Sequence, residues 1–182
     1  MNSNNPLAPE IEASDWLNTD RPLSLAGLRG RVVVLHAFQM LCPGCVSHGL
    51  PQARRIREVF SEEDVAVIGL HTVFEHHDVM GADALRVFVH EYRIGFPVGI
   101  DKAAGNGGIP LTMQNYALRG TPSLLLIDRR GHLRLNHFGR IDDLQMGALI
   151  GQWVNDSADS TSASTFTADD VAPGRCSVER NS

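Results

Sequence analysis

The chain has 182 residues, of which 43% are hydrophobic, which is enough for one domain with a sizeable core and flanking segments. Its formal charge of −5, its 6% of aromatic residues and the absence of a Lys/Arg cluster argue against a nucleic acid or an anionic membrane as partner. The first ten residues lack the features of a secretory signal, and no apolar run reaches the about 18 residues that suggest a membrane span. We therefore expect a cytoplasmic protein, or a periplasmic one if a signal peptide was trimmed.

Composition divides the chain into three parts. Residues 1–14 predict a flexible N-terminal lead, residues 15–154 predict one folded domain, and residues 155–182, rich in Ser, Thr, Asp and Ala, predict a disordered tail. The three cysteines, an odd number with one close pair, do not form a disulfide framework. Cys176, which lies in the tail, is interpreted as an exposed bystander rather than an extra resolving thiol.

Strand and helix patterns alternate along the domain. The apolar residues around Trp16 are expected to lie across one end of it, and the nearly continuous apolar run 31–38, interrupted by His36, predicts a strand buried on both faces. Three- and four-residue spacings predict a helix over 43–60, kinked at Pro51. Further strands are predicted at 65–70, 96–100, 123–128 and 133–138, and further helices at 82–92, 111–118 and 141–154. The alternation favours an α/β fold with helices on both faces of the sheet, ending in an antiparallel hairpin.

The turn between the first central strand and the first helix reads Cys42-Pro43-Gly44-Cys45. Cys42 falls at the N-cap, Pro43 at the first helical position, and Cys45 about one turn in. Free backbone N–H groups and the positive end of the helix dipole favour the thiolate of Cys42. We interpret Cys42 as the attacking thiol and Cys45 as the resolving thiol of a redox pair. Metal binding and inert core thiols are the weaker interpretations, because tetrahedral zinc would need two more ligands.

The order of these motifs resembles the thioredoxin-like redoxins of the AhpC-TSA superfamily, above all the TlpA-type thiol:disulfide oxidoreductases. The matching features are the strand 31–38 before the CxxC, Pro51, the strand residues 67–69, Gly120-Thr121-Pro122 before the strand 124–128, and Gly131 in the last hairpin. The resemblance covers about residues 14–154. It implies a thioredoxin-like fold, with a central mixed sheet flanked by helices and a strand–helix unit inserted between residues 65 and 100.

The resemblance also implies roles for two residues far from the CxxC. Pro122 would be a cis-proline that faces the two cysteines, and the backbone at Thr121 would pair with an extended substrate while metal is kept from the thiols. The chain departs from the family pattern in Leu41, in the order Pro43-Gly44, in the late position of Pro51 and in His36. The late Pro51 predicts a bulge in the helix near Gly49. His36 replaces a buried acid, and we interpret it as a satisfied core histidine, ahead of a proton relay for Cys45.

The leading hypothesis is a thiol:disulfide oxidoreductase that works through a redox-active Cys42/Cys45 disulfide and needs no separate cofactor. Its partners would be a disulfide-containing protein or small molecule and an external thiol electron donor. The alternative is a peroxiredoxin-like thiol peroxidase, which passes through a sulfenic acid. Gln39, three residues before Cys42, weakens this alternative because peroxidases of that kind normally carry a threonine or serine there.

A further alternative is a Cu/Zn-binding metallochaperone or sensor that combines the CxxC with His71 or His137. The histidines at 71, 76 and 77, close to two acidic residues, are the most tempting separate metal site. A polar loop of this kind is usually just solvated, so no metal ligand is assigned from the sequence.

Overall fold

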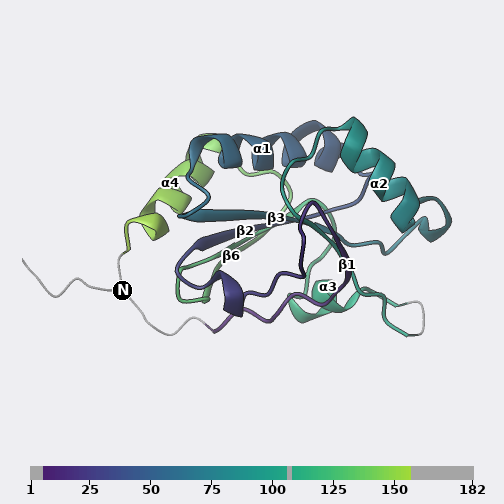
Figure 1. Cartoon of the computed structure of the whole chain (residues 1–182), viewed down its shortest axis with the longest axis horizontal. Coiled ribbons are helices and arrows are strands. Elements are labelled where there is room, and N and C mark those ends of the chain that lie inside the picture. The colour runs from purple at the N-terminus through teal and green to yellow at the C-terminus, as the bar shows by residue number, and fades with distance from the viewer. Residues whose placement is uncertain (1–5, 106–107, 157–182) are drawn as a thin grey trace, which may run out of the picture.

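The computed structural model describes residues 6–105 and 108–156. A six-stranded sheet forms its centre, with four α-helices, two short 3-10 turns (η1 and η3) and one π-helical turn (η2) around it (Figure 1). The elements are β1 (Ala13–Leu17), η1 (Ala26–Leu28), β2 (Val32–Phe38), η2 (Cys45–Gly49), α1 (Leu50–Val59), β3 (Val65–His71), η3 (His77–Val79), α2 (Ala82–Glu91), β4 (Val98–Asp101), α3 (Leu111–Asn115), β5 (Ser123–Ile127), β6 (Leu133–Phe138) and α4 (Asp143–Val154).

The strands lie in the order β1-β4-β3-β2-β5-β6. Strands β2, β3 and β4 are parallel, whereas β1, β5 and β6 run antiparallel to their neighbours. The predicted mixed sheet with helices on both faces is therefore confirmed: α1, α2 and α4 cover one face and α3 lies on the other (Figure 1). The thioredoxin-like fold places β2 between β3 and β5, at the centre of the molecule.

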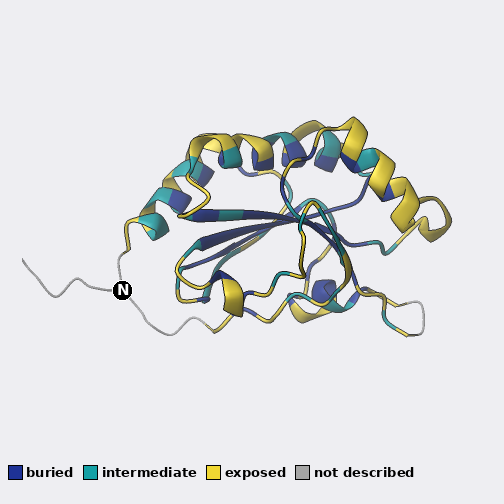
Figure 2. Cartoon of the chain, in the orientation of Figure 1, coloured by how far each residue is buried: buried dark blue, intermediate teal, exposed yellow. Residues whose placement is uncertain are grey.

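The central strands are buried along most of their length (Figure 2), and their side chains divide between two clusters, one on each face of the sheet. Val32 and Val34 pack with the apolar sides of α1, α2 and α4, and Val33 and Leu35 pack with residues of α3 and the N-terminal segment. All seven residues of β2 are buried, as the continuous apolar run predicted. The CxxC turn follows shortly after this buried central strand.

Strand β1 is the one strand that the sequence did not predict. Trp16, expected across one end of the domain, lies in β1 opposite Gly99 of β4. The indole occupies the space that a side chain at 99 would need, because a Cβ built there would lie 3.2 Å from two ring atoms of Trp16. The short sequence of β1 has no strand pattern of its own, and pairing with β4 decides its conformation.

The N-terminal segment that the structure describes is packed, which differs from the predicted flexible lead. The N–H of Ala8 donates to the carbonyl of Gly131 at 2.8 Å, and the Glu10 carboxylate accepts from the N–H groups of Leu25 and Ala26. Residues 157–182, including Cys176, lie outside the described residues, so the predicted tail is untested. Within residues 6–105 and 108–156, no helix is long and apolar enough to cross a membrane.

Candidate active site

The two cysteines of the CxxC form a disulfide in the turn that joins β2 to the following helix, and their Cα atoms are 5.2 Å apart. Cys42 is partly exposed, whereas Cys45 is completely buried. The helical turn begins at Pro43, and the N–H of Cys45 donates to Cys42 Sγ at 3.2 Å and to the Cys42 carbonyl at 3.1 Å. The sulfur of Cys42 thus occupies the N-cap position that the sequence predicted.

A π-helical turn follows immediately, over Cys45–Gly49, and the N–H of Leu50 closes it by donating to the Cys45 carbonyl. Pro51, which has no N–H, lies in the first turn of α1. The predicted bulge near Gly49 is therefore this π turn, which inserts one residue into the helix ahead of the proline. Such insertions change the direction of the side chains that precede them, here those of the redox turn.

His36 of β2 lies directly beneath this π turn. It is buried, with 2% of its surface exposed, and a Cβ built on Gly49 would be only 2.2 Å from His36 Nε2. The imidazole therefore occupies the space that a side chain at position 49 would need, and only glycine fits there. Burial lowers the pKa of His36 from 6.5 to about 4, so the ring is neutral at pH 7.

The interpretation of His36 as a satisfied core histidine is only half right. The ring is in the core, but its Nδ1 has no hydrogen-bond partner in the part of the chain that the structure describes. Buried polar atoms are nearly always paired, because an unpaired one costs free energy. An unpaired imidazole nitrogen close to a redox pair is a feature that needs a functional explanation.

Thr121 and Pro122 come from the loop before β5, about 80 residues after the CxxC in sequence. The Thr121–Pro122 peptide is cis, and a Cβ built on Gly44 would lie 3.3 Å from Pro122 Cδ. Pro122 therefore faces the redox turn, as the family resemblance implied. The N–H of Gly139, after β6, donates to the Pro122 carbonyl at 2.8 Å and holds the loop in place.

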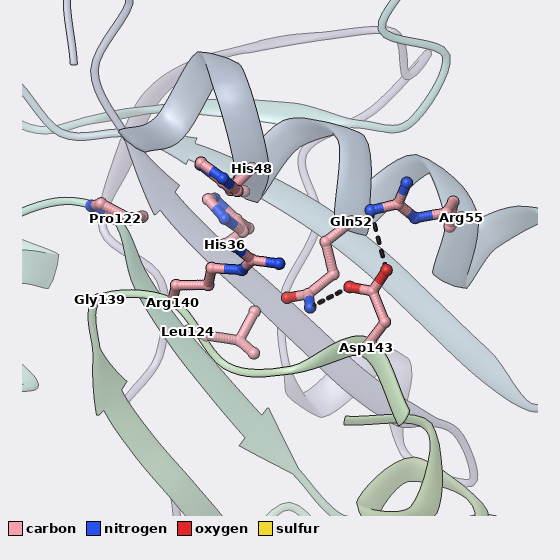
Figure 3. A pocket seen from close by; sticks show the side chains of 10 residues that line it. His36, His48, Gln52, Arg55, Pro122, Leu124, Gly139, Arg140 and Asp143 are labelled. Carbon is pink, nitrogen blue, oxygen red and sulfur yellow. Dashed lines mark hydrogen bonds and ion pairs between the residues drawn. The ribbon is translucent and has the colours of Figure 1, made fainter. Parts of the chain in front are cut away.

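Pro122 also lines a small pocket of about 30 Å³. Figure 3 shows His36 and His48 above it, Pro122 at one side, and the Arg140 side chain extending across it toward Gln52. On the far wall, Gln52 Nε2 donates to the Asp143 carboxylate at 2.7 Å. Sequence reasoning missed this pocket, because its residues come from β2, η2, α1 and three later segments of the chain.

The histidines proposed as a metal site do not converge. His71 is the last residue of β3 and is buried, with its ring 5.4 Å from that of Phe38, whereas His76 and His77 are exposed. Burial lowers the pKa of His71 from 6.5 to about 4. Across residues 6–105 and 108–156, no three His, Cys, Asp or Glu side chains are placed to hold one metal ion.

A cysteine pair at the start of a helix, opposite a cis-proline and on this sheet, defines a thioredoxin-like redox enzyme of the thiol-disulfide oxidoreductase type. Comparison with family models agrees: the model of the AhpC/TSA family matches residues 5–136. The chain belongs to the AhpC/TSA family.

Two solved structures are similar over almost their whole length. A thiol-disulfide isomerase from Corynebacterium glutamicum is 49% identical, with a TM-score of 0.81, over 85% of this chain and 99% of that one. The thioredoxin-like superfamily protein SPOA0173 is 54% identical, also with a TM-score of 0.81, over 84% of this chain and 99% of that one. Both support a redox enzyme of the thioredoxin-like type.

The curated relatives are much longer proteins. NHL repeat-containing protein 2 of Bos taurus is 31% identical over 137 residues, which are 73% of this chain and 18% of that protein. Protein DipZ of Mycobacterium tuberculosis is 27% identical over 172 residues, which are 91% of this chain and 24% of that protein. The chain thus spans about a fifth to a quarter of the length of these relatives.

Proposed function

We propose that the protein reduces disulfide bonds in protein or small-molecule substrates, with Cys42 as the nucleophile and Cys45 as the resolving thiol. The observation that carries this assignment is the difference in accessibility between the two sulfurs. Cys42 is partly exposed and can meet a substrate, whereas Cys45 is completely buried and can meet only Cys42. The N–H of Cys45, which donates to Cys42 Sγ, favours a negative charge on that sulfur after reduction.

The reaction transfers two electrons from the dithiol to the substrate. The Cys42 thiolate attacks one substrate sulfur, so that a mixed disulfide forms and the other substrate sulfur leaves as a thiolate that takes up a proton. Cys45 loses its proton and attacks Cys42 Sγ, which breaks the mixed disulfide and releases the second substrate thiol. An external thiol donor then returns the Cys42–Cys45 disulfide to the dithiol. In a reducing compartment such as the cytoplasm, the net direction is substrate reduction.

Single cysteine variants test the two roles. Stopped-flow measurements with the reduced protein against an insulin-type disulfide should show rapid reduction by the wild type and only background reduction by Cys42→Ser. Cys45→Ser should still attack but should accumulate the mixed disulfide, which mass spectrometry detects. Cys176→Ser is the matched control and should behave as the wild type. Rapid consumption of hydrogen peroxide without disulfide reduction would reject this function in favour of a thiol peroxidase.

His36 is proposed as the proton relay for Cys45. It lies beneath the π turn that Cys45 begins, its ring is neutral at pH 7, and it borders the pocket beside Pro122. Because its pKa is about 4, His36 does not keep the Cys45 proton; the neutral ring relays it, accepting a proton at one nitrogen while the other nitrogen releases one as Cys45 becomes the attacking thiolate. The charged groups that line the same pocket are Arg55 of α1, Arg140, and Asp143 of α4, with His48 of η2 as the other titratable group.

Replacing His36 by leucine should slow the resolution of the mixed disulfide by roughly 100-fold at pH 7, the lower end of the effect of positioned proton transfer. The defect should shrink toward pH 9, where solvent alone deprotonates a thiol. The measurement is the pH profile of single-turnover resolution. His71→Leu is the matched control, since it removes another buried imidazole on the next strand but not from this pocket. An unchanged pH profile for His36→Leu would exclude the relay.

A further inference from the structure

We propose that the pocket bounded by His36, Gln52, Pro122 and Arg140 binds a carboxylate of the substrate, so that the enzyme favours disulfides with a carboxylate a few bonds from the reactive sulfur. The inference rests on the proposed function and adds a substrate class to it. The pocket shares Pro122 with the redox turn, because that proline both lines the pocket and contacts Gly44 between the two cysteines. A substrate whose sulfur is at Cys42 therefore has the pocket beside it.

The charges of the pocket favour an anion. The carboxylate of Asp143 is already engaged, by Arg55 at 2.9 Å and by Gln52 Nε2 at 2.7 Å. Arg140 forms no ion pair with any acidic side chain in the part of the chain that the structure describes, and it is exposed. The pocket thus holds one uncompensated guanidinium, whose planar set of N–H donors suits a carboxylate. This local positive charge contrasts with the net charge of −5 of the whole chain.

The back of the pocket is polar and rigid. His36 is 2% exposed, its Nδ1 lacks a hydrogen-bond partner among the described residues, and its Nε2 edge faces Gly49, which also lines the pocket. Gln52 is 8% exposed and is fixed by its bonds to Asp143 and to the Ile141 carbonyl. The buried, neutral imidazole of His36 can donate an N–H to a bound group. The site therefore combines this donor with the charged Arg140 side chain and the fixed Gln52 amide.

The size of the pocket selects a small group. With a volume of about 30 Å³, the pocket suits a compact group such as a carboxylate better than an aromatic ring or a long apolar side chain. The specificity is therefore expected to depend on charge close to the disulfide rather than on a large side chain.

The test compares two probes of nearly the same size and shape, the dianion 3,3′-dithiodipropionate and its uncharged diamide, in their reaction with the reduced wild-type protein. We expect the dianion to react about five- to tenfold faster at low salt, the range for a partly exposed charge pair and a charge-assisted hydrogen bond, and the preference to decline at high salt. Arg140→Gln should abolish the preference, so that the dianion and the diamide react at similar rates, and Arg140→Lys should keep part of it. Arg119→Gln is the matched control, because Arg119 lies over the Phe138 ring and outside the pocket.

Each outcome decides between the two hypotheses. Equal rates for both probes with the wild type, or an Arg140→Gln defect that is the same for both, would overturn the carboxylate site while the proposed function stands. A loss of preference in Arg119→Gln as large as in Arg140→Gln would also overturn it, since a diffuse charge effect would then suffice. Absence of reaction with both probes, in protein that still reduces an insulin-type disulfide, would overturn the carboxylate site alone; absence of reaction with the insulin-type disulfide as well would overturn the disulfide reductase function.

Discussion

Replacing Gly49 by alanine is expected to lower the free energy of unfolding by about 3 kcal/mol, the upper end of the cost of overpacking a core. The new methyl group would lie 2.2 Å from His36 Nε2 and 2.4 Å from Cε1. Neither side can give way: Gly49 ends the π turn that Leu50 closes, and His36 is on the central strand between β3 and β5. The preference of helices for alanine over glycine, about 1 kcal/mol, is too small to compensate. Chemical unfolding of the oxidised protein measures the change.

Two further variants make this result specific. Gly147→Ala in α4 is the matched control, since nothing lies within 4 Å of a Cβ built at 147, and it should be neutral or slightly stabilising. His36→Ala combined with Gly49→Ala should recover most of the stability that Gly49→Ala loses, because the space of the imidazole then accepts the methyl group. Strictly additive effects of the two substitutions would contradict the direct contact.

Acidification from pH 7 to pH 4.5 is expected to destabilise the fold by about 2 to 3 kcal/mol for each of the two buried histidines. Burial lowers the pKa of both His36 and His71 from 6.5 to about 4. Between these values the unfolded chain binds protons that the folded chain does not, so stability is present above pH 6.5 and is lost as the pH falls toward 4. Urea unfolding at a series of pH values gives the dependence directly.

His71→Leu isolates one of the two contributions. Because leucine does not titrate, the variant should lose about 2 kcal/mol less than the wild type between pH 7 and pH 4.5, and the difference between the two proteins removes the effects of all other groups. His90→Gln is the control, since its side chain is 85% exposed and meets solvent in the folded and unfolded chain alike. Identical pH dependence of His71→Leu and the wild type would show that His71 is not held neutral.

Much of the fold was predictable because the relevant information is local. The continuous apolar run 31–38 is β2, and the periodic spacing after Pro43 is the redox helix. Strand β1 was not predicted, since its five residues become a strand only by pairing with β4. The packing of the N-terminal segment was not predicted either, because some of its hydrogen-bond partners, such as Gly131, lie more than 100 residues away. Polarity alone does not distinguish a free segment from one held by distant groups.

A redox pair at Cys42 and Cys45, with Cys42 as the proposed nucleophile, could be predicted from the sequence by itself, because the spacing of the two cysteines at a strand–helix junction is a local property of the chain. The tertiary structure alone decided what surrounds them. Pro122 meets the redox turn, His36 fits under Gly49 with one nitrogen unpaired, and Arg140 extends over a pocket that no single segment contains. The two reacting cysteines are close in sequence and could be found there. The residues around them come from separate segments, and only the folded sheet brings these together.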